Sequence, residues 1–137
     1  MKQHTTNYQD TFIEVAPDCP VKTAEVPPLK LSGKTAANLQ FEMIMENPYT
    51  FTSDDVLFHC FAVKNQIPRS QLKAAREAYF SKGQPCLRAS PLTKRYGWGV
   101  HCDAAGKVAI FGVETSNYKK LAADKTLKIV KAMRSGR

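Results

Sequence analysis

Two runs of β-forming residues in the second half of the sequence constrain the fold most. Residues 96–102 and 107–113 are rich in aromatic and β-branched side chains, and a short loop ending in Gly106 separates them. Strand-forming runs joined by a short glycine-containing loop are typical of a β-hairpin. The sequence therefore predicts an antiparallel pair of strands here.

A third strand is predicted near the start of the chain, followed by a long loop. Residues 11–15 alternate between apolar and polar side chains and favour a strand. Residues 16–33 hold four prolines, which exclude a helix interior and indicate an ordered loop. Gly33-Lys34-Thr35 ends this loop, but Pro28 stands where a phosphate-binding loop needs its first glycine, so that motif is rejected.

Helical signals occupy most of the remaining chain. Thr52 and Ser53 precede two aspartates, which is a strong helix start. Residues 35–46 alternate like a strand yet repeat polar side chains every four positions; their composition and the Asn47-Pro48 stop favour a helix. Further helices are predicted over residues 52–66, 70–82, 116–121 and 124–133. This order predicts an α+β fold, with a mainly antiparallel sheet and a β-hairpin packed by four to five helices.

The length of 137 residues suits one hydrophobic core, so a single domain over residues 1–137 is expected. The sequence has no apolar stretch of 18 residues and does not begin like a signal peptide. We therefore expect a cytoplasmic protein with no membrane partner. The oligomeric state stays open.

The four cysteines are scattered, without the paired spacing of zinc sites. His59-Cys60 and His101-Cys102 are adjacent pairs, but neighbouring side chains diverge on strands and helices alike. The sequence therefore predicts free, buried thiols, no metal site and no cofactor. The cysteines are Cys19, Cys60, Cys86 and Cys102.

Charge is distributed unevenly along the chain. Residues 1–68 carry a net charge of −3, whereas residues 69–137 carry +11 and all six arginines. Such a polarity suits a surface that attracts phosphate or another anion. A solvated basic face without a ligand is the alternative, and it stays open.

The segment over residues 81–99 concentrates the candidate binding residues. Arginine side chains can grip a phosphate with two parallel hydrogen bonds, and aromatic rings can stack on a flat ligand. We therefore predict a site for an anionic partner, either a phosphate-bearing small molecule or nucleic acid. Trp98, between two glycines, is also predicted to lie against the sheet, with the glycines close to another backbone. The predicted contact residues are Arg88, Lys94, Arg95, Tyr96 and Trp98.

Two alternatives of other classes remain. Cys86 lies in a basic neighbourhood that favours a reactive thiolate, and His101 is the histidine in this half of the chain available to serve as its base. An enzyme would then have a pocket around Cys86, Arg88 and His101. The third possibility is an interaction module whose basic half meets an acidic protein.

Several segments resemble a family of short bacterial proteins described as a domain of unknown function. They are HTTNYQDTFIEVAPDCP, ENPYTFTSDDVLF, SKGQPCLRASPLTKRYGWG and the closing KAMRS, and the resemblance spans nearly the whole chain. It implies a one-domain protein but no activity and no functional residues.

Overall fold

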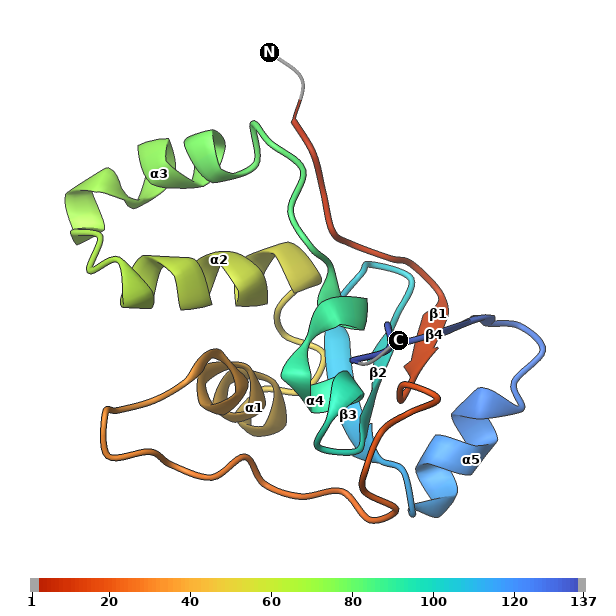
Figure 1. Ribbon diagram of the computed structural model, residues 1–137. Coiled ribbons are helices and arrows are strands. Elements are labelled where there is room, and N and C mark those ends of the chain that lie inside the picture. Colours follow the sequence, from red (N-terminus) through yellow and green to blue (C-terminus); the bar gives the residue numbers. More distant parts are fainter. Residues whose placement is uncertain (1–2, 136–137) are drawn as a thin grey trace.

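The computed structural model describes residues 3–135, which form a four-stranded sheet with helices on both faces (Figure 1). Short 3₁₀ turns occur at Arg69–Gln71 and Leu87–Ala89. In chain order, the elements are β1 (Thr11–Glu14), α1 (Ala36–Glu46), α2 (Ser53–Lys64), α3 (Leu72–Tyr79), α4 (Pro91–Lys94), β2 (Trp98–Cys102), β3 (Val108–Gly112), α5 (Ser116–Ala122) and β4 (Lys128–Lys131).

The sheet has the order β3-β2-β1-β4. β2 pairs antiparallel with both β3 and β1, and β4 pairs parallel with β1. The predicted α+β class, the mainly antiparallel sheet and the hairpin are therefore confirmed. Residues 36–46 form the helix α1, as their composition favoured. Thr35 caps this helix: its hydroxyl accepts a hydrogen bond from Asn38 N, and the Asn38 side chain accepts one from Thr35 N.

The helix predicted over residues 124–133 is wrong, because the structure has the strand β4 there. Asp10 O accepts a hydrogen bond from Lys128 N at 2.8 Å, and Glu14 O accepts one from Ala132 N at 2.9 Å. The edge of β1 thus provides backbone hydrogen-bond partners for this segment. No local pattern in the sequence predicts this pairing. Met133, just beyond β4, is 53% exposed.

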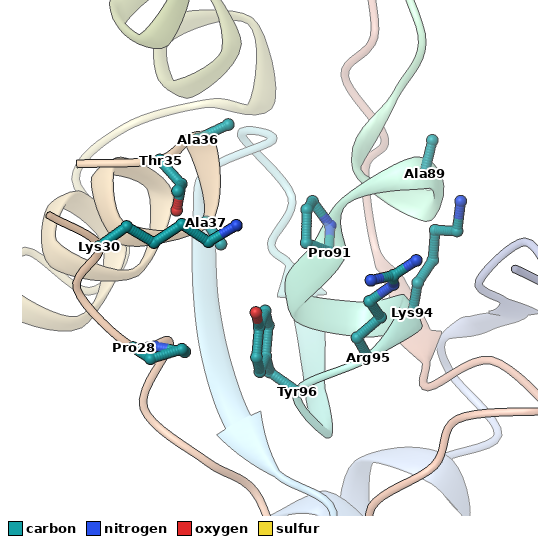
Figure 2. Close-up of a pocket in the computed structure, with 10 residues that line it drawn as sticks. All are labelled: Pro28, Lys30, Thr35, Ala36, Ala37, Ala89, Pro91, Lys94, Arg95 and Tyr96. Carbon is teal, nitrogen blue, oxygen red and sulfur yellow. The ribbon is translucent and has the colours of Figure 1, made fainter. Parts of the chain in front are cut away.

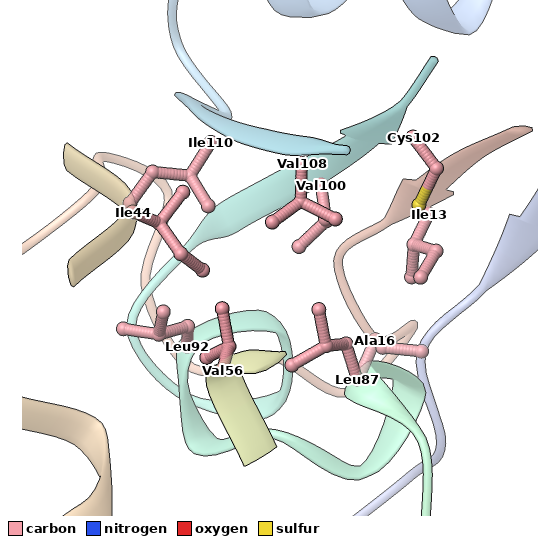
Figure 3. Packing of buried hydrophobic residues seen from close by; sticks show 11 residues of the cluster. Ile13, Ala16, Ile44, Val56, Leu87, Leu92, Val100, Cys102, Val108 and Ile110 are labelled. Atoms are coloured by element: carbon pink, nitrogen blue, oxygen red, sulfur yellow. The ribbon is translucent and has the colours of Figure 1, made fainter. Parts of the chain in front are cut away.

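One face of the sheet carries the main core, beneath α1, α2 and α4 (Figures 1 and 3). Side chains of the sheet meet one or two apolar residues from each covering helix, and each such burial contributes about 1.5–3 kcal/mol. The fully buried members include Ile13, Ile44, Val56, Leu87, Leu92, Val100 and Val108.

The opposite face is covered by α5, which packs through Tyr118. Its ring meets the edge of Phe12 with centroids 5.0 Å apart, and its hydroxyl accepts a hydrogen bond from Val15 N at 2.9 Å. Gly99 lies beneath both rings, so near that an added Cβ would be 2.6 Å from each. A glycine is therefore required for α5 to dock.

α3 is attached to the rest of the domain mainly by aromatic contacts with α2. No residue of α3 is fully buried. The ring centroids of Phe61 and Tyr79 are 4.6 Å apart, and the guanidinium of Arg76 lies over the rings of Phe58 and Phe80. No helix in the described part of the chain is long and apolar enough to cross a membrane.

Candidate anion-binding pocket

A pocket of about 380 Å³ opens between the N-terminus of α1 and the end of α4 (Figure 2). The loop before α1 closes its third side. Figure 2 shows the Lys30 ammonium and the Tyr96 hydroxyl pointing into the space between the two helices, with Lys94 and Arg95 on the α4 side. Pro28 and Pro91 add apolar wall.

α4 is short, and polar contacts of its first turn hold it in place. The Ser90 side chain caps it by accepting a hydrogen bond from Leu92 N at 3.1 Å, and Pro91 supplies the fixed backbone angle suited to a first helical position. The Ser90 hydroxyl also donates to the side-chain oxygen of Gln40 on α1. These contacts fix the end of α4, from which Lys94 and Arg95 extend.

The loop that carries Lys30 is also fixed. The side-chain amide of Asn38 donates to the carbonyl oxygens of Pro27 and Pro28, at 2.9 and 3.4 Å. Lys30 O accepts a hydrogen bond from Gly33 N at 3.0 Å, which closes a turn just before Thr35. Asn38, the partner of Thr35 in the cap of α1, therefore also holds the loop that carries Lys30.

The charged side chains that line the pocket are all positive. Within residues 3–135 the ion pairs are Lys34–Glu42 and Arg76–Asp55, so none involves Lys30, Lys94 or Arg95. No acidic residue lies in the first turn of α1, where the helix carries its partial positive charge. Three cations and a helix N-terminus thus border one cavity, and no carboxylate of the described residues pairs with these cations. Such an environment favours an anion.

Tyr96 lines the pocket, whereas Trp98 lies outside it. The Trp98 indole N–H donates to Glu25 O at 2.8 Å, and its ring lies 5.3 Å from that of Phe41, between centroids. Trp98 is therefore half-buried against the core, as predicted. A Cβ on the preceding Gly97 would lie 3.1 Å from the Ala24 backbone, which confirms the expected close approach.

Arg88 also lies away from the pocket. Its Nε donates to Lys131 O at 2.7 Å, and its own carbonyl oxygen accepts a hydrogen bond from Met133 N at 2.8 Å. It fastens the end of β4 to the segment before α4. The structure thus brings Lys94, Arg95 and Tyr96 together and leaves Arg88 and Trp98 in other environments.

Cys86 and His101 have different partners and do not meet. Cys86 Sγ is 3.5 Å from the Tyr8 hydroxyl, and His101 Nδ1 is 2.8 Å from the Tyr49 hydroxyl. His101 also points to the face of the sheet opposite its neighbour Cys102, which belongs to the core. The arrangement therefore gives the Cys86 thiol a phenol, and not an imidazole, as its neighbour.

All four cysteines are free, and two are buried. Burial raises the pKa of the Cys60 thiol to about 11 and that of Cys102 to about 12. Both are inert packing groups at neutral pH. Among the residues described, no group of three or more His, Cys, Asp or Glu side chains is placed to hold a metal ion.

These features define a small α+β domain with a basic pocket between α1 and α4. Residues 3–137 match a family of unknown function, DUF6157, and the chain belongs to that family. This confirms the resemblance of the sequence to an uncharacterised family. No curated protein and no solved structure matches the chain.

Proposed function

We propose that this protein binds a phosphate-bearing small molecule in the pocket between α1 and α4. The observation that carries the proposal is that Lys30, Lys94 and Arg95 line one cavity, and that none of them forms an ion pair within residues 3–135. The N-terminus of α1 adds a fourth positive contribution. The Tyr96 hydroxyl supplies a neutral hydrogen-bonding group, and its ring supplies an apolar wall.

A small ligand fits this geometry better than nucleic acid does. The cavity of about 380 Å³ lies within the usual range for small-molecule sites, roughly 300–1,000 Å³. Other basic residues of the second half lie on α3, α5 and β4 and in the segments that connect the elements. α3 and α5 lie at opposite sides of the molecule (Figure 1). A nucleic-acid backbone would need such charges aligned on one continuous surface.

Calorimetric titration with inorganic phosphate, pyrophosphate and phosphate monoesters at low ionic strength tests the proposal. Lys30→Gln, Lys94→Gln and Arg95→Gln should each weaken binding about ten- to a hundredfold, because a hydrogen bond to a charged group contributes about 1.5–3 kcal/mol. Lys119→Gln and Lys120→Gln are the matched controls, since both remove one exposed charge from α5. Equal losses in both sets would show a diffuse charge effect and contradict a site in the pocket.

A further inference from the structure

A second, mostly apolar hollow adjoins the anion pocket. This groove of about 520 Å³ lies between α1 and α2 and shares Thr35 and Ala36 with the pocket. Four large side chains from three helices line it, all of them half-buried: Leu39, Leu57, Phe61 and Tyr79.

The groove exists because α3 leaves part of α2 uncovered. α3 contacts α2 through the Phe61–Tyr79 ring pair, and beyond that pair the two helices enclose a further hollow of about 590 Å³. Val63, on the open side of α2, is 47% exposed and also lines the groove. Contact between water and concave apolar surface of this kind is unfavourable. Covering that surface with an apolar group is therefore favourable.

The groove and the anion pocket are neighbours at two points. The first is the start of α1, where the exposed Ala36 side chain borders both hollows. The second is the hydrogen bond between Ser90 and Gln40: Gln40 lines the groove, whereas the residues flanking Ser90 line the pocket. One molecule with a charged end and an apolar end can therefore occupy both hollows across Ala36.

We propose that the ligand is a single-chain anionic amphiphile. Its phosphate headgroup lies among Lys30, Lys94 and Arg95, and its hydrocarbon chain lies along the groove past Leu39 and Leu57. This inference rests on the proposed function, because the headgroup uses the same pocket. It adds that a phosphate group alone fills only part of the site.

Alkyl phosphates of increasing chain length test the chain separately from the headgroup. We expect octyl phosphate, kept below its micelle concentration, to bind much more tightly than methyl phosphate. The gain should be about two- to fourfold for each methylene that enters the groove, since burial of one methylene contributes about 0.8 kcal/mol. Octyl glucoside, which has the same chain without the charge, should bind far more weakly than octyl phosphate.

Groove variants show where the chain lies. Val63→Gln and Leu39→Gln should reduce the affinity for octyl phosphate by about tenfold and leave methyl phosphate unaffected. Val63 is exposed, so its variant keeps the fold even if Leu39→Gln does not. Met133→Gln, an exposed apolar-to-polar change beyond β4, is the matched control and should alter neither affinity. Arg95→Gln should weaken both ligands.

The outcomes separate this inference from the proposed function. Equal affinity for methyl and octyl phosphate would overturn the amphiphile and leave the anion site standing. Octyl phosphate binding that Arg95→Gln does not weaken would overturn both. Co-sedimentation with phosphatidylcholine vesicles containing lysophosphatidic acid, lost in Arg95→Gln, would identify a membrane lipid as the source. Octyl phosphate binding without co-sedimentation would identify a soluble amphiphile.

Discussion

The hydroxyl of Ser90 donates a hydrogen bond to the side-chain oxygen of Gln40, and this contact joins α4 to α1 beside the pocket between these helices. Both residues are 4% exposed. The same hydroxyl caps α4 by accepting from Leu92 N. One side chain therefore sets both the start of α4 and its position relative to the other wall of the pocket.

Replacing Ser90 by Ala should reduce stability and ligand binding together. The change removes a helix cap and leaves the Gln40 amide buried without its partner, each worth about 1–2 kcal/mol. We expect the free energy of unfolding in urea to fall by about 2–4 kcal/mol. Phosphate affinity should fall too, since Lys94 and Arg95 lose their fixed position.

Ser116→Ala is the control for this measurement. Ser116 is exposed, and the cap of α5 is the neighbouring Thr115. Its replacement should leave the unfolding midpoint unchanged. A Ser90→Ala protein as stable as the Ser116→Ala protein would refute the role given to Ser90.

Gly99→Ala should destabilise the packing of α5 on the sheet. The added methyl group would lie 2.6 Å from both Phe12 and Tyr118, so one ring must move. Overpacking of this kind costs about 1–3 kcal/mol, which a thermal melt would show as a lower midpoint. Gly83→Ala is the matched control, because its nearest neighbour would be the His4 ring at 3.9 Å. Equal midpoints for the two variants would contradict the close packing.

Local signals in the sequence were enough to predict the hairpin, β1 and the starts of α1 and α2. Turn residues, caps and side-chain periodicity act over a few residues, so a sequence displays them directly. The caps at Thr35 and Thr52 are examples, each completed by a side chain three residues later.

The errors concern features that depend on distant partners. β4 forms because β1 has a free edge, and α4 is fixed through Gln40 on another helix. The pocket between α1 and α4 combines Arg95 with Lys30. These two residues are far apart in the sequence, and only the fold brings them to one pocket. The available clue was the capped start of α1 beside Lys30, since helix N-termini favour anions.

The cysteines offer a test of burial in solution. Cys60 and Cys102 are buried, with pKa values raised by burial to about 11 and about 12, whereas Cys19 and Cys86 are partly exposed. We expect Ellman's reagent to modify two thiols of the native protein and all four after unfolding in guanidinium. Cys60→Ala and Cys102→Ala should leave the native count at two. Rapid reaction of all four native thiols would mean that the core is open.

His101 lies on the face of the sheet that α5 covers, and we expect its protonation to make stability depend on pH. Burial lowers the pKa of His101 below its ordinary value, and the carboxylates of Asp103, Asp124 and Asp10 oppose that shift without reversing it. The imidazole Nδ1 is hydrogen-bonded to the Tyr49 hydroxyl. Within the described residues, the His101 ring thus faces the Tyr49 hydroxyl and the charges of these three carboxylates.

The sign of the effect follows from proton uptake. The unfolded chain protonates His101 near its ordinary pKa of about 6.5, whereas the folded protein takes up that proton only at lower pH. His101 therefore makes stability fall as pH drops from about 7 toward 5, through the unfolded pKa, and makes no further difference below the folded pKa. His101→Asn keeps a hydrogen-bonding group near Nδ1 but does not titrate, so urea unfolding of this variant should depend less on pH over that range. A steeper dependence in the variant would mean that the surrounding carboxylates, and not burial, determine the protonation of His101.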